Sequence, residues 1–120
     1  MTSVELSLIV LKTRWIDQVR AFYACLGLSF QEEQHGRGPI HYSTRLDHVV
    51  FEVYPLPDNE EADIGVRLGF TVERLADVLG LLVENGATVR SKLAESDWGL
   101  RAVVNDPDGR AVELYQRSVT

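Results

Sequence analysis

Cysteine is almost absent from this 120-residue chain, which contains only Cys25. A single cysteine excludes an intrachain disulfide and is typical of proteins from a reducing compartment. Cys25 lies within an apolar helical pattern, so we expect a buried structural thiol rather than a nucleophile. Long apolar runs are also missing, because none approaches the ~20 residues of a membrane span, and no signal-peptide pattern opens the chain. We therefore expect a cytoplasmic protein.

Basic residues are also scarce: 12 lysines and arginines face 18 acidic residues, for a net charge of −6. This balance argues against nucleic acid or an anionic membrane as a partner, and permits a cationic small molecule. Several catalytic motifs are missing as well. The sequence has no Gly-x-Ser-x-Gly elbow, no His-Glu-x-x-His, no Walker motif and no paired-cysteine zinc spacing.

An internal repeat is the strongest positive feature of the sequence. Glu52 and Glu113 each lie within a short apolar and aromatic run, Phe-Glu-Val-Tyr and Val-Glu-Leu-Tyr, and are 113 − 52 = 61 residues apart. Gly27 and Gly86 each follow a helical pattern and precede a strand pattern, at a similar separation of 86 − 27 = 59 residues. A repeat of this length indicates two copies of one supersecondary unit. We therefore expect the two glutamates on equivalent strands, facing one cavity.

The predicted elements follow the same βαβββ order in both halves. In the first half we expect strands at 4–12, 28–33, 39–46 and 48–54, with a helix that ends at Gly27. In the second half we expect strands at 64–72, 87–91, 100–105 and 111–116, with a helix that ends at Asn85-Gly86. A proline-containing acidic linker at 57–62 separates module one, residues 1–56, from module two, residues 63–120, within a single domain.

Three segments resemble the vicinal oxygen chelate superfamily, which includes glyoxalase I, extradiol dioxygenases, and fosfomycin and bleomycin resistance proteins. They are Phe22-Tyr23-Ala24-Cys25-Leu26-Gly27-Leu28, Trp98-Gly99-Leu100-Arg101 and Asp106-Pro107-Asp108-Gly109-Arg110-Ala111-Val112-Glu113-Leu114. The resemblance implies an α+β fold in which two βαβββ modules form a cupped, eight-stranded mixed sheet with helices on its convex face. It also implies a homodimer.

The resemblance further implies four inward positions that can ligate a divalent metal such as Ni, Zn, Mn or Fe. Glu52 and Glu113 take two of these positions and are suitable oxygen ligands. Leu6 and Arg67 take the other two, where leucine cannot ligate and arginine repels a cation. The set of metal ligands therefore looks incomplete. A register slip of one residue would bring Glu5 or Ser7 inward instead.

The two glutamates have three possible roles. They could bind a metal, act as a catalytic acid and base, or be neutralised by Arg67 on the same inner face. Arg67 and Arg101 could instead bind an anionic substrate between them. In the alternative, Arg67 pairs with a cavity glutamate and Arg101 lies on the surface.

Other candidate substrate contacts are Trp98, Tyr115 and His41. Trp98 could form an aromatic wall or cover the edge of the core, and Tyr115 closes the second repeated run. His41 could reach the cavity as a base or a ligand, depending on strand parity. His35 falls in a turn and His48 at a strand end, where we expect solvated side chains.

Three interpretations of the function remain open from the sequence. The first is a glyoxalase-like protein that binds a small molecule in the sheet cavity, with metal-dependent lyase, isomerase or dioxygenase chemistry at Glu52 and Glu113. The second is a non-catalytic protein of the bleomycin resistance type, which sequesters a small molecule or drug without a metal. A structural or regulatory domain without a ligand is a third reading.

Overall fold

The computed structural model describes residues 3–117, which contain eight strands and two helices. The ends of the two expected modules, residues 1–2 and 118–120, lie outside this description. The chain divides into two compact units, residues 1–62 and 63–120. No helix in the described part of the chain is long and apolar enough to cross a membrane. The elements are β1 (Leu8–Thr13), α1 (Ile16–Ala24), β2 (Gln31–Glu33), β3 (His41–Leu46), β4 (Val49–Pro55), β5 (Leu68–Val72), α2 (Leu75–Glu84), β6 (Thr88–Ser96), β7 (Gly99–Asn105) and β8 (Ala111–Gln116).

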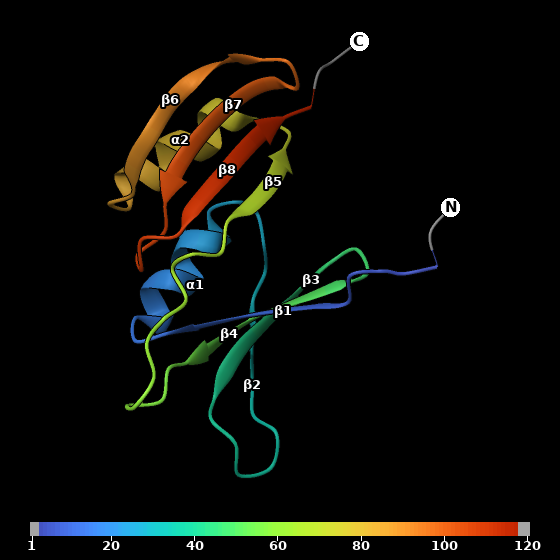
Figure 1. The fold of residues 1–120 in the computed structure, drawn as a ribbon, viewed down its shortest axis with the longest axis vertical. Helices are drawn as coiled ribbons and strands as arrows, with labels where there is room; N and C mark the ends of the chain where they lie inside the picture. The colour runs from blue at the N-terminus through green and yellow to red at the C-terminus, as the bar shows by residue number, and fades with distance from the viewer. Residues whose placement is uncertain (1–2, 118–120) are drawn as a thin grey trace. The chain divides into compact units, whose positions relative to one another are not determined.

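Each unit contains one four-stranded mixed sheet (Figure 1). The strand order is β1-β4-β3-β2 in the first unit and β5-β8-β7-β6 in the second. In both sheets the first and last strands of the unit are parallel neighbours, and the remaining pairs are antiparallel. The predicted α+β class and the two βαβββ modules are therefore confirmed.

In the first unit, α1 covers one face of the sheet. Val19, Phe22 and Tyr23 of α1 are buried, and so are Phe51 and Val53 of β4. The Tyr23 ring meets the Phe51 ring edge to face, with centroids 5.1 Å apart. Because side chains alternate along a strand, Glu52 lies on the opposite face, and no helix within residues 3–62 covers that face.

In the second unit, α2 covers the sheet in the same way (Figure 1). Leu75 and Leu82, seven residues apart on one side of α2, are fully buried, together with Val112 and Leu114 of β8. Val112 and Leu114 are separated from Phe51 and Val53 by the same 61 residues that separate the two glutamates. Glu113 consequently lies on the helix-free face of its own sheet.

Four predicted strand boundaries differ from the observed ones by three residues or more. One of them is the start of β2, which lies at Gln31 rather than at residue 28. β1 starts at Leu8 rather than residue 4, and β5 starts at Leu68 rather than residue 64. In both cases the parallel partner strand begins one residue before the first pairing, so the preceding residues extend beyond the ladder. β6 continues to Ser96 because it forms a long hairpin with β7, with register shifts between residues 89 and 94.

Cys25 also differs from its prediction, because it caps the C-terminal end of α1 and is half-buried rather than fully buried. Partial burial raises the pKa of its thiol. A raised pKa lowers the fraction of reactive thiolate, so the expectation that Cys25 is no nucleophile agrees with its surroundings.

The turn between β7 and β8 contains a buried ion cluster. Arg110, only 1% exposed, places Nη1 3.1 Å from Asp106 Oδ2 and 2.8 Å from Asp108 Oδ2. Its Nε donates to the backbone carbonyl of Asp63 at 2.9 Å. Gly109 adopts φ +99°, a conformation that side chains disfavour. The Asp-Pro-Asp-Gly-Arg segment is therefore a turn that stabilises the second unit through buried ion pairs.

Candidate functional site

Glu113 is the centre of a charged cluster on the open face of the second sheet. Its carboxylate accepts four hydrogen bonds, from three side chains. Arg67 Nη2 donates to Oε2 at 3.0 Å, and Arg101 donates to Oε1 through Nη2 at 2.7 Å and Nε at 3.2 Å. The Tyr115 hydroxyl also donates to Oε1, at 2.8 Å. We call these four residues the Glu113 cluster.

The strand register explains why these residues meet. Glu113 and Tyr115 share one face of β8, and Arg101 pairs with Tyr115 across the β7–β8 ladder. Arg67 lies two residues before Gly69, the residue of β5 that pairs with Glu113. The two guanidinium groups and one carboxylate carry a formal sum of +2 − 1 = +1, so the cluster repels a cation and favours an anion.

The cluster changes the ionisation of its members. Hydrogen bonds from Arg101 and from Tyr115 lower the pKa of the Glu113 carboxyl. Burial opposes them with a smaller effect, and the charges of Arg67 and Arg101 add a further lowering. The hydrogen bond to Glu113 in turn raises the pKa of Arg101. Both shifts favour the ionised pair.

The lowered pKa predicts a specific dependence of stability on pH. Its stabilising effect is complete above the unfolded-state pKa of about 4.3 and is lost as the pH falls through the lower folded-state value. We expect the free energy of unfolding to decrease more steeply with acidification below about pH 5 in the wild type than in Glu113→Gln. Urea unfolding followed by circular dichroism across this range measures both slopes. Glu95→Gln, an exposed position on β6, is the matched control, and equal slopes in all three proteins would contradict the prediction.

A pocket of about 420 Å³ opens beside this cluster. It is lined by Thr71, Trp98, Tyr115, Gln116 and Arg117. The Trp98 side chain is largely solvent-accessible, at 73% exposure, whereas the Tyr115 ring is held through its hydroxyl. The pocket therefore combines two aromatic surfaces with one cationic group.

His41 is the most unusual residue of the first unit. It is 1% exposed, and its ring stacks on Tyr54 of β4 with centroids 4.0 Å apart. Nδ1 lies 3.2 Å from the backbone carbonyl of Pro39, an acceptor, so Nδ1 carries the proton and Nε2 the lone pair in the neutral ring. Among the described residues, Nε2 is buried without a hydrogen-bond partner.

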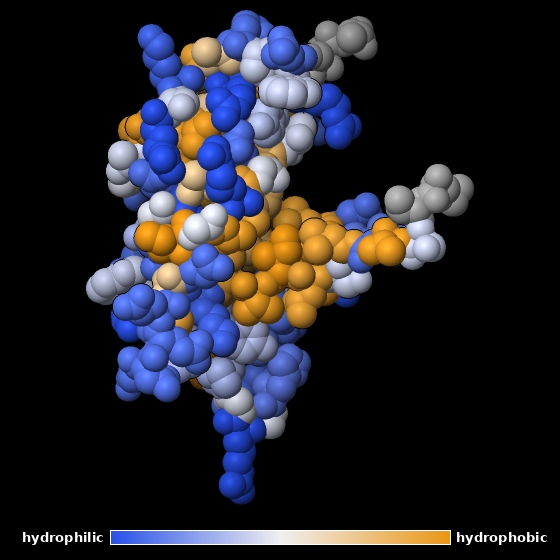
Figure 2. Space-filling model, viewed as in Figure 1, coloured by the Kyte–Doolittle hydropathy of each residue, from blue (hydrophilic) through white to orange (hydrophobic). Residues whose placement is uncertain are grey.

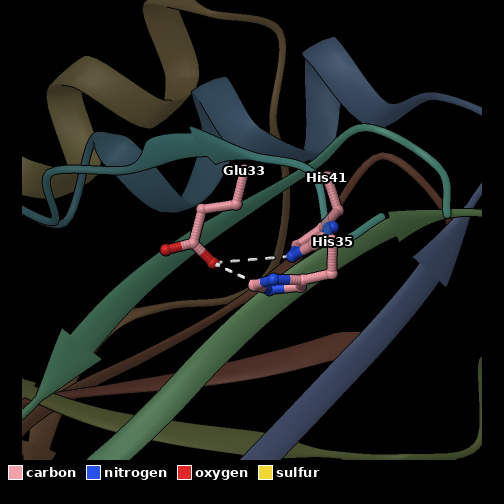
Figure 3. A group of neighbouring side chains, drawn as sticks. All are labelled: Glu33, His35 and His41. Carbon is pink, nitrogen blue, oxygen red and sulfur yellow. Dashed lines mark ion pairs between the residues drawn. The ribbon is translucent and has the colours of Figure 1, made fainter. Parts of the chain in front are cut away.

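The Glu33 carboxylate and the His35 imidazole lie beside the His41 ring (Figure 3), and the Glu52 carboxylate is also near Nε2. Glu33 Oε1 lies 3.5 Å and Glu52 Oε2 lies 3.6 Å from His41 Nε2. His35 Nε2 is 3.7 Å from the same Glu33 oxygen. Glu33, opposite His41 across the β2–β3 ladder, shares the open face with Glu52.

The structure places the predicted site residues in two groups. Arg67, Arg101 and Tyr115 meet at Glu113, and Trp98 lines the adjoining pocket. In the other unit His41 meets Glu52. Leu6 precedes β1 and is 61% exposed.

Two residues of the His41 group were not predicted. The sequence predicts no functional role for Glu33, and it predicts a solvated turn for His35. His35 is exposed and lies in that turn, yet its ring also lies 5.1 Å from the His41 ring. The observed register pairs Glu33 with His41. The predicted strands 28–33 and 39–46, paired end to end, would instead set Glu33 opposite Pro39, so the predicted bounds do not reveal this group. His48 lies in the exposed β3–β4 turn, as expected.

The residues at the four positions implied by the resemblance do not fit a divalent ion. Leu6 and Arg67 supply no ligand atom, and the Glu113 carboxylate is engaged by two cations and a phenol. A metal there would have to displace both guanidinium groups. We therefore assign no chemistry through such an ion.

Comparison with known proteins places this architecture in a family. The model of the glyoxalase-like domain matches residues 8–115. No curated protein matches the chain. A glyoxalase/bleomycin resistance protein/dioxygenase family enzyme from Burkholderia phytofirmans PsJN is 22% identical, with 96% of this chain and 100% of that chain covered and a TM-score of 0.72.

Two further solved structures share the fold. TnmS3, an antibiotic-binding protein from Streptomyces sp. CB03234, is 19% identical, with 98% and 99% of the chains covered and a TM-score of 0.74. The oxidase ChaP-H2 is 18% identical, with 98% and 96% covered and a TM-score of 0.77. At these identities the likeness concerns the fold alone. The family match, which spans nearly all of the described residues, shows that this chain belongs to the glyoxalase-like domain family.

Proposed function

We propose that this protein binds a small organic molecule at the open face of its second unit, without a metal ion at Glu113. One observation carries the proposal: the Glu113 carboxylate already accepts four hydrogen bonds from Arg67, Arg101 and Tyr115. A carboxylate offers about four acceptor sites, so little capacity remains for a metal. Glu113 then holds Tyr115, which lines the pocket, in place and does not act as a metal ligand.

The pocket favours a flat, anionic ligand. Trp98 and Tyr115 offer ring faces on which a conjugated molecule can stack, and aromatic contacts of this kind contribute beyond simple area burial. Arg117 lines the same pocket, and a guanidinium binds carboxylate, sulfonate or phosphate groups with two parallel hydrogen bonds. The net positive charge of the Glu113 cluster adds to this preference. The cationic ligand permitted by the overall charge of −6 suits this site less well.

The neighbours with a shared fold support binding as a function. TnmS3 is an antibiotic-binding protein, so this fold is compatible with sequestration of an organic molecule. For the present chain, the proposed ligand is defined by chemistry: a ring system that fits about 420 Å³ and carries an acidic group. A pocket of this volume lies within the range usual for small-molecule sites.

Titration with 8-anilinonaphthalene-1-sulfonate, a flat aromatic anion, tests the proposal in the presence of a chelator. We expect saturable binding that is weakened about tenfold in Trp98→Ala, because a stacking surface is lost. Arg117→Ala should weaken the sulfonate probe but not neutral N-phenyl-1-naphthylamine. Trp15→Ala removes an exposed tryptophan from the first unit, at 53% exposure against 73% for Trp98, and should leave the affinity unchanged.

Two results would count against this function. Binding that is equally weakened by Trp15→Ala would indicate non-specific adsorption of the dye. A ligand or turnover that needs a divalent metal, and is lost in both Glu52→Gln and Glu113→Gln, would instead support the metal-dependent lyase, isomerase or dioxygenase. The homodimer implied by the resemblance stays a prediction, which sedimentation velocity would test.

A further inference from the structure

We propose that the first unit contains a binding site for a divalent transition-metal ion, formed by Glu33, His35 and His41 with Glu52 as the fourth ligand. This site is separate from the Glu113 cluster and does not depend on the proposed ligand pocket. Its four side chains come from β2, the following turn, β3 and β4. The three residues Glu33, His35 and His41 offer ligand atoms that all lie within 4.8 Å of one another (Figure 3).

The distances between the ligand atoms suit a tetrahedral ion. Zn²⁺ bonds of about 2.1 Å at tetrahedral angles place neighbouring ligand atoms about 3.4 Å apart. The observed separations are 3.5 Å for Glu33 and His41, 3.6 Å for Glu52 and His41, and 3.7 Å for Glu33 and His35. Glu52 lies outside the group whose ligand atoms are all within 4.8 Å of one another, so its carboxylate must turn toward the other ligands to complete the coordination.

His41 is prepared as a ligand by its surroundings. The Pro39 carbonyl holds the proton on Nδ1, which directs the lone pair of Nε2 toward the two carboxylates. That nitrogen is fully buried and lacks a hydrogen-bond partner within residues 3–117. An unsatisfied buried acceptor between two anionic groups is costly, and a cation would satisfy all three at once.

The frame around these ligands is fixed by the backbone. Glu33 and His41 form a register pair of the β2–β3 ladder, and Glu52 pairs with Ser43 on β4. The turn that carries His35 is closed by a hydrogen bond from the Gly38 amide to the His35 carbonyl, and Gly36 adopts φ +59°. The Tyr54 ring supports His41 from one side. The His35 side chain, 73% exposed, would be ordered by the ion.

The donor set indicates which ions to expect. Two imidazoles and two carboxylates suit Zn²⁺, Ni²⁺ and Co²⁺, whereas Mg²⁺ and Ca²⁺ prefer six or more oxygen ligands. The formal charge of two ionised carboxylates, −2, matches a divalent ion. We therefore expect Zn²⁺ to bind and Mg²⁺ not to compete.

Calorimetric titration of the chelator-treated full chain with Zn²⁺ tests this site, and Co²⁺ absorption reports on its geometry. We expect one ion per chain, with at least about tenfold weaker binding in His35→Ala and in His41→Gln. His35 is exposed, so its variant should fold normally even if the buried His41 variant does not. His48→Ala removes a histidine of similar exposure, 76% against 73%, and should leave the affinity unchanged.

The Glu113→Gln variant separates this site from one that uses both repeated glutamates. We expect it to bind Zn²⁺ as the wild type does, while Glu52→Gln weakens binding. No detectable Zn²⁺ binding would overturn the proposal, and so would equal losses in His35→Ala and His48→Ala. A loss in Glu113→Gln would also overturn it, because the ion would then involve the other unit. The Zn²⁺ titration tests the first unit, whereas the dye titration tests the ligand pocket of the second unit, so the failure of one proposal can be distinguished from the failure of the other.

Discussion

Replacing Arg110 with alanine is expected to destabilise the protein by about 3–5 kcal/mol, because it leaves buried carboxylates without their cation. Asp106 is fully buried and Asp108 nearly so, at 0% and 6% side-chain exposure. Burial alone would lower the pKa of Arg110, but its hydrogen bonds to Asp106 and Asp108 outweigh this and raise it. Removal of the guanidinium also breaks the bond to the Asp63 carbonyl. Urea unfolding monitored by circular dichroism measures the effect.

Two control variants sharpen this experiment. Arg110→Lys keeps the charge but loses the forked geometry, so it should fall between the wild type and Arg110→Ala. Arg90→Ala removes an exposed arginine from β6 of the same unit and should change stability by no more than about 0.5 kcal/mol. If Arg110→Ala were as mild as Arg90→Ala, the buried ion cluster would not stabilise the second unit.

Replacing Phe51 with alanine is expected to cost about 3–5 kcal/mol, because it leaves a cavity in the buried core of the first unit. Phe51 is 1% exposed on β4, and its ring contacts Tyr23 of α1 and Phe30, with centroids 5.1 Å and 6.0 Å away. The variant therefore weakens the attachment of α1 to the sheet. The same unfolding experiment measures the loss.

Phe51→Leu retains most of the apolar volume and should cost clearly less than the alanine variant. Ile40→Ala is the matched control in the same unit, since Ile40 is 48% exposed and should tolerate truncation. A loss for Phe51→Ala no larger than that for Ile40→Ala would mean that the aromatic cluster is not the core that supports the helix-free face.

The secondary structure could be predicted from local patterns. Apolar residues alternate along strands and recur at helical spacing along helices, and these positions are the ones whose side chains are buried. Val53 and Leu114 continue the alternation of Phe51 and Val112, so both last strands were identified with their glutamates on the opposite face. The starts of β1 and β5 could not be found this way. They depend on where the parallel partner strand begins, and that partner lies more than 40 residues away.

The candidate site was only partly predictable because a residue's role depends on which neighbours its strand acquires. The two glutamates are equivalent in sequence and in register, yet Glu113 is held by Arg101 and Arg67 while Glu52 faces His41. The sequence offers Arg67 as one possible partner of the glutamates, but the spacing of the repeat does not say which glutamate it meets. The sequence does not decide whether Arg101 lies in the cavity or on the surface, and only the β7–β8 register brings it next to Tyr115.

The sequence by itself determined the duplicated βαβββ order, the family and the parity that puts Glu52 and Glu113 on helix-free faces. These properties follow from local apolar periodicity and turn residues, which are encoded along the chain. Only the tertiary structure decided the charge environment of each glutamate and brought Glu33, His35 and His41 together. Ladder register and turn geometry set distances to within a fraction of an ångström, and ion pairing and metal ligation depend on distance at that scale.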